Sequence, residues 1–80
     1  MKIPVIKKLV ENYSIDELQA AEEALAEEMQ PTILIEGEDE GEQLTHAFAA
    51  IFIIQKMAAT GCDFKTALRE YTSKVRESIS

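Results

Sequence analysis

Residues 47–54 read AFAAIFII, and this stretch decides how the chain folds. It lies within a run from about residue 40 to residue 60 that is followed by Gly61, a residue suited to the left-handed end of a helix. The stretch is apolar around nearly the whole circumference of a helix, whereas a surface helix carries one apolar stripe. We therefore predict a helix over residues 40–60 that is enclosed by neighbours, to which a second chain can contribute.

The segment before this helix is acidic. Residues 35–46 read IEGEDEGEQLTH and hold five acidic side chains and the one histidine of the chain. Asp39 and Glu42 have the spacing of a capping box, and acids near a helix N-terminus are stabilised by the macrodipole by about 0.3–1 kcal/mol each. Capping and a solvated loop account for much of the cluster.

A metal site is the alternative interpretation of the same segment. Glu42 and His46 are one helical turn apart, and a loop carboxylate such as Glu38 could supply a third ligand for a transition metal. His46 also shares a helical stripe with apolar residues, which favours a hydrogen-bonded histidine at the edge of a core. The sequence is compatible with a metal-ligating or a hydrogen-bonded His46, and no resident cofactor is expected.

Two helices are predicted before the acidic segment. The first covers residues 4–12, because Pro4 suits a first helical turn and an apolar face repeats with helical spacing at Ile6, Leu9, Val10 and Tyr13. The second starts at Ser14, which forms a capping box with Glu17, and continues to Pro31. Its predicted buried stripe consists of Leu18, Ala21, Leu25 and Met29.

The segment TILIE, residues 32–36, is β-branched and short, and it predicts an extended or β segment. A lone strand cannot pair its own backbone groups, so it needs a partner. That partner could be residues 2–6, formed as a strand instead of a helix, residues 32–36 of a second chain, or water and neighbouring side chains.

A last helix follows Gly61. Asp63 can cap it, and its apolar stripe includes Phe64, Ala67, Leu68, Tyr71 and Val75. The predicted fold class is thus mainly α: a small four-helix single domain over residues 1–80, with one short extended or β segment at residues 32–36.

Charge and composition restrict the function. The net charge is −7, and no Lys or Arg occurs between Lys8 and Lys56, so a nucleic-acid partner is not expected. The longest apolar run, residues 47–54, is far shorter than the roughly 20 residues that span a bilayer, so no membrane span is expected. A single cysteine and the lack of a signal-peptide pattern favour the cytoplasm.

Cys62 follows a glycine and precedes a helix N-terminus, where the helix dipole stabilises a thiolate. It is a candidate redox residue, although the adjacent Asp63 acts the other way and no second cysteine is present to resolve an oxidised thiol. The sequence shows no nucleophile triad, no paired acid and base and no phosphate-binding loop, so an enzyme is not expected.

Three segments, IPVIKKL, EGEDEGEQLTH and DFKTALREYTSKVR, resemble those of a family of short, uncharacterised bacterial proteins found among Bacteroidetes. That resemblance implies no catalytic or binding residues. It does imply a thiol-stress context, because genes of this kind often neighbour peroxiredoxin and thioredoxin-like genes.

We expect a small non-enzymatic interaction or accessory protein that forms a homodimer. A metal-binding protein and an accessory to thiol or peroxide metabolism are the alternatives. The candidate interface residues are Phe52, Ile53, Ile33 and Ile35. Phe52 is expected on the side of its helix away from Phe48 and Leu44, where the other elements of one chain cover it least.

Overall fold

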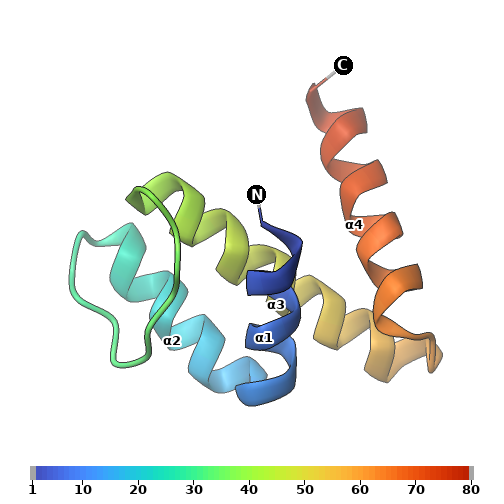
Figure 1. Ribbon diagram of the computed structural model, residues 1–80, viewed down its shortest axis with the longest axis horizontal. Coiled ribbons are helices and arrows are strands. Elements are labelled where there is room, and N and C mark those ends of the chain that lie inside the picture. The colour runs from blue at the N-terminus through green and yellow to red at the C-terminus, as the bar shows by residue number, and fades with distance from the viewer. Residues whose placement is uncertain (1, 80) are drawn as a thin grey trace.

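The computed structural model describes residues 2–79, with side chains through residue 75. It contains four helices: α1 (Ile3–Asn12), α2 (Ile15–Ala26), α3 (Glu40–Thr60) and α4 (Phe64–Ile79) (Figure 1). No strand occurs within residues 2–79. The predicted mainly α, four-helix fold is therefore confirmed, and each of the four predicted helices begins within a residue of its expected position.

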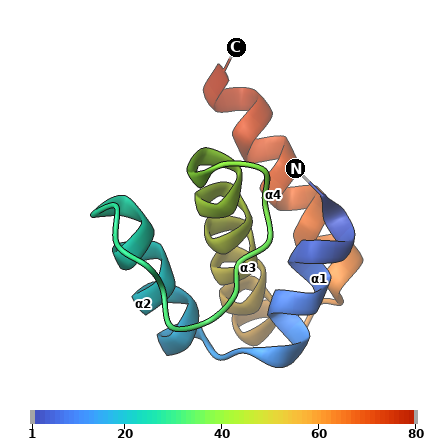
Figure 2. The ribbon, with the colours of Figure 1, turned by 60° about the vertical axis from the view of Figure 1, so that its left-hand side comes forward.

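Helix α3 is the centre of the fold. Each of α1, α2 and α4 packs on it, and Figure 2 shows α3 between α2 and α1, with α4 behind. Both ends of α3 are formed as the sequence predicts: Asp39 caps the start, and Gly61, with φ 72°, ends the helix in the left-handed conformation. The predicted enclosure is also observed on most sides, because six of its side chains are buried: His46, Ala47, Ala49, Ala50, Ile51 and Ile53.

Two apolar clusters cover α3 from different directions. The first lies between α1, α2 and α3, and its buried members are Val5, Leu9, Leu18, Ala21, Leu25, Ile35, Ala50 and Ile51. The second lies between α1, α3 and α4, and its buried members are Ile6, Ala49, Ile53 and Ala67. Two of the four buried α3 members are alanines, whose small side chains leave room for the neighbouring helices. Helix α1 contributes to both clusters and so joins the two halves of the core.

The predicted β segment at residues 32–36 is not formed. This segment belongs to the loop between α2 and α3, and the alternative strand at residues 2–6 lies instead at the start of α1. Pro4 at the first turn and the helical repeat of apolar residues outweigh the short alternation there. Ile35 is stabilised by burial in the first cluster, where only 2 % of it is exposed, so its apolar character reflects packing and not strand pairing.

Helix α2 ends earlier than predicted. Its last residue is Ala26 and not a residue next to Pro31, and Met29, predicted to be buried, is 60 % exposed. The helix closes with two backbone bonds, from the N–H of Glu28 to the Leu25 carbonyl and from the N–H of Met29 to the Ala24 carbonyl. This is the Schellman motif, which requires a left-handed residue, and Glu28 supplies it with φ 60°.

Replacing Glu28 with glycine should stabilise the protein. A non-glycine residue in the left-handed region is strained by roughly 1–2 kcal/mol, and glycine removes that strain at some cost in chain entropy. We expect Glu28→Gly to raise the free energy of unfolding by about 0.5–1 kcal/mol in urea titrations. Glu27, with φ −93°, is the matched control, and Glu27→Gly should lower or not change stability. A loss of stability in Glu28→Gly would contradict this description of the helix end.

Candidate functional site

His46 lies on α3, and its ring is fully buried. Its Nε2 accepts a hydrogen bond from the backbone N–H of Lys2 at 2.9 Å, and its Nδ1 lies 2.7 Å from the carbonyl oxygen of Glu36. A backbone N–H can only donate and a carbonyl can only accept, so the ring carries its proton on Nδ1. Both nitrogens of His46 are therefore occupied by backbone groups.

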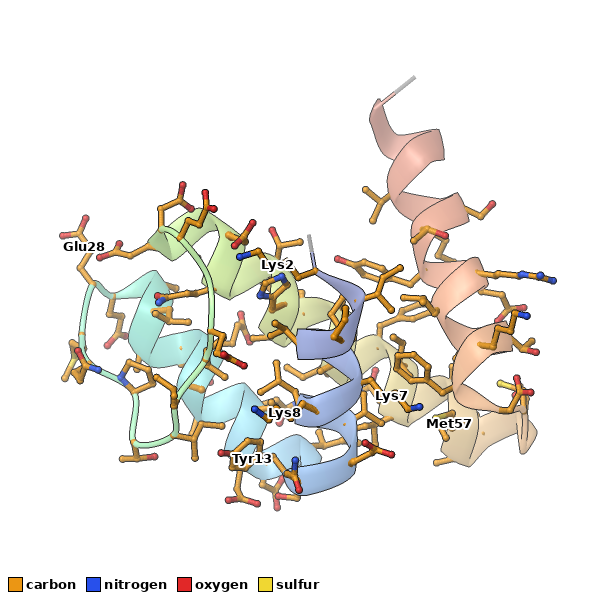
Figure 3. The ribbon with its side chains drawn as sticks, viewed as in Figure 1. Lys2, Lys7, Lys8, Tyr13, Glu28 and Met57 are labelled. Atoms are coloured by element: carbon orange, nitrogen blue, oxygen red, sulfur yellow. The ribbon has the colours of Figure 1, made fainter. Side chains whose placement is uncertain are left out.

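This arrangement connects three parts of the chain that are far apart in sequence. Figure 3 shows Lys2 at the N-terminal end of α1, beside α3. Glu36 belongs to the loop before α3, which crosses over the helix in Figure 2. His46 thus anchors both the start of α1 and the end of that loop to the central helix. The sequence-based expectation of a hydrogen-bonded histidine at a core edge agrees with this geometry.

Removing the imidazole should destabilise the fold. His46→Ala leaves the partly buried backbone N–H of Lys2 and carbonyl of Glu36 without their partner and creates a cavity, which together cost about 2–4 kcal/mol. The free energy of unfolding from urea titration measures this loss. Gln19→Ala, at an exposed position of α2, should stay within about 0.5 kcal/mol of wild type. A loss below about 1 kcal/mol in His46→Ala would mean that the two bonds do not stabilise the protein.

Two acidic residues at the start of α3, Asp39 and Glu42, accept hydrogen bonds from backbone N–H groups there. Asp39 Oδ1 accepts the backbone N–H of Glu42 at 2.8 Å, and Glu42 Oε1 accepts the backbone N–H of Glu38 at 2.9 Å. The predicted capping box is therefore modified, because Glu42 reaches Glu38 and not Asp39. The N–H of Glu38 holds the pKa of the Glu42 carboxyl below its ordinary value of 4.5, as nearby Lys2 does to a smaller extent.

The candidate metal ligands Glu38, Glu42 and His46 are not arranged as a metal site. His46 has both nitrogens bonded to the backbone, and Glu42 binds the end of the loop. Among the residues that the structure describes, no three His, Cys, Asp or Glu side chains are grouped closely enough to hold a metal ion. These residues are close in sequence because they belong to the start of α3 and the loop before it.

Cys62 is half-buried and packs against the second apolar cluster. Its backbone N–H donates to Thr60 Oγ1 at 3.3 Å. Asp63 occupies the N-terminus of α4, where its Oδ1 accepts the backbone N–H of Thr66 at 2.9 Å. Hydrogen bonds from the side chain and backbone of Thr66 hold the pKa of Asp63 below its ordinary value of 3.8. The helix end that was expected to stabilise a Cys62 thiolate is thus already occupied by a carboxylate.

The four candidate interface residues have different surroundings. Ile53 and Ile35 are buried in the core of the chain itself, with 0 % and 2 % exposed, and Ile33 is half-buried. Their apolar surface is largely used within one chain. Phe52 keeps an exposed part, although the ring of Tyr71 lies 5.5 Å from its ring and the ammonium of Lys74 lies 5.4 Å from its centre. Burial raises the pKa of the Tyr71 phenol.

The expectation that Phe52 lies away from Phe48 is wrong. Residues four apart in a helix lie on the same side, and both belong to the continuous α3 (Glu40–Thr60). They are part of what we call the α3 stripe, a row of unburied residues with alternating spacings of four and three: Gly41, Thr45, Phe48, Phe52, Gln55 and Ala59. Phe48 is 48 % exposed. Sequence reasoning missed Phe48 because the all-round apolar run hides this repeat.

A hollow of about 250 Å³ lies beside the C-terminal half of the α3 stripe, lined by Phe52, Gln55, Lys56, Ala59 and Lys74. Lys56 also forms an ion pair with Glu70 of α4, with 3.1 Å between nitrogen and oxygen. An exposed aromatic ring and a partly aromatic, partly basic hollow therefore occur on the same side of α3.

Together these features define a small helical protein with a structural histidine and a partly exposed α3 stripe that carries two aromatic rings. A model of the family described as "Family of unknown function (DUF6952)" matches residues 1–80, and the chain belongs to this family. No curated protein and no solved structure matches the chain. None of the helices within residues 2–79 combines the length and apolar character needed to cross a bilayer.

Proposed function

We propose that this chain is a small non-enzymatic interaction protein that forms a homodimer through the α3 stripe. The observation that carries the proposal is Phe48, a large aromatic side chain left 48 % exposed next to Phe52 on the central helix. Aromatic residues are enriched in the buried centres of protein interfaces. The 4–3 spacing of the stripe is the spacing with which two helices pack along each other.

The roles of the polar groups also support a binding function over catalysis. Both nitrogens of His46 bind backbone groups, and the carboxylates of Asp39, Glu42 and Asp63 bind the N–H groups at helix starts or in the adjoining loop. These groups are used in maintaining the fold. The uncovered apolar surface of α3 is what remains for interaction with another molecule.

The energetic argument for self-association follows from size and burial. An 80-residue chain buries a smaller fraction of its surface than a larger domain, so additional burial at an interface stabilises it appreciably. Complete burial of a phenylalanine side chain is worth about 1.5–3 kcal/mol, and a symmetric dimer buries each stripe residue twice. The net charge of −7 opposes association, so the interface needs an apolar centre.

Phe48→Glu tests this proposal directly. Because Phe48 is half-exposed, its replacement should leave the monomer folded while placing a charge at the centre of the interface. We expect light scattering at micromolar concentration to give about twice the 8.9 kDa chain mass for wild type, and the chain mass for Phe48→Glu with unchanged helical circular dichroism.

Leu34→Glu is the matched control. Leu34 is another exposed apolar residue, 74 % exposed, but it lies in the loop before α3 and outside the α3 stripe. This variant should remain dimeric. A wild-type monomer at these concentrations would refute the proposed function, and a Phe48→Glu dimer would exclude the stripe as its interface.

A further inference from the structure

We propose that the occupant of the α3 stripe is a second copy of this chain whose α3 runs antiparallel to the first. This inference rests on the proposed function and specifies the geometry of its interface. Three features of the described surface support it: the symmetry of the stripe, the distribution of charge near the two ends of α3, and the positions of Phe48 and the neighbouring hollow.

The α3 stripe is symmetric about residue 50. Reversing the helix direction around that point places small residues opposite each other at Gly41 and Ala59, polar residues at Thr45 and Gln55, and aromatic residues at Phe48 and Phe52. A two-fold axis between the copies uses the same patch on both chains, which is the requirement for a closed dimer. A parallel pair would also place like residues together, each opposite its own copy, so the symmetry permits the antiparallel register and the charges decide the direction.

The charges along this face favour the same direction. The start of α3 is acidic and exposed at Glu38, Asp39 and Glu40, whereas Lys56, which pairs with Glu70, and Lys74 lie near its C-terminal half. In an antiparallel pair, the acidic start of one helix lies within about two turns of the partner's basic residues. A parallel pair would place two acidic ends side by side, and like charges in contact oppose association.

The hollow beside Phe52 lies next to the position that Phe48 of the partner subunit takes in the antiparallel register. Phe48 lies one turn before Phe52, which lines the hollow together with Gln55, Lys56, Ala59 and Lys74. In the antiparallel register, Phe48 of the partner subunit lies against Phe52 at the near edge of this hollow. The two-fold axis repeats the contact, so each copy contributes one protruding ring and receives one. The Lys74 ammonium already lies over the Phe52 ring, which keeps the hollow partly basic.

Disulfide trapping distinguishes the two directions. In a Cys62→Ala background, Thr45→Cys and Gln55→Cys are prepared separately, mixed in equal amounts, allowed to exchange subunits and oxidised mildly. Antiparallel pairing places position 45 of one chain against position 55 of the other, within disulfide reach. Two copies of position 45 are then about 15 Å apart along the helix axis, which is too far for a disulfide.

Intact-mass spectrometry should show the mixed Thr45→Cys/Gln55→Cys disulfide in at least tenfold excess over either homodisulfide. Homodisulfides in excess would show a parallel pair. A statistical mixture, or no disulfide in a protein that light scattering shows to be dimeric, would place the interface elsewhere. Each of these results overturns the antiparallel inference but leaves the homodimer intact. A background protein with the mass of a monomer would refute the proposed function itself, together with this inference.

Discussion

The middle of α3, residues 47–54, is apolar on nearly all sides, and the structure of this chain follows from how the other elements cover it. Helices α1, α2 and α4 each supply one apolar face, and the loop before α3 adds Ile35. Apolar packing by itself is not directional, but the two hydrogen bonds of His46 fix where α1 and the loop lie on α3. The side that these elements cover least is the α3 stripe, where Phe48 is 48 % exposed.

Signals that depend on a few neighbouring residues predicted the structure well. The capping box at Ser14 and Glu17, the cap at Asp39 and the left-handed Gly61 are all formed, because each depends only on local backbone geometry. The end of α2 was less predictable, since a glutamate takes the left-handed position that usually belongs to glycine. The loop before α3 was also misassigned, because the β-branched character of TILIE does not distinguish strand pairing from burial of Ile35 in a core.

In the candidate site, too, the local spacing was predictable and the contacts with distant residues were not. The sequence indicates that Glu42 and His46 are one turn apart, but the partners that determine their roles come from the backbone of Glu38, Lys2 and Glu36. Backbone partners leave no pattern in the sequence, so a structural histidine resembles a metal ligand until the fold is known. Exposure of Phe48 was similarly hidden, because the covering helices had to be placed before the uncovered side of α3 could be identified.

The central claim is that a second copy covers the side of α3 that the chain itself leaves open. Hydroxyl-radical footprinting read by mass spectrometry, performed over a series of protein concentrations, measures this cover directly. Labelling of Phe48 should fall as the concentration rises, while labelling of Met29 and Leu34, which are exposed in or near the loop, stays constant. Equal labelling of Phe48 at all concentrations that span dissociation of the dimer would contradict the account.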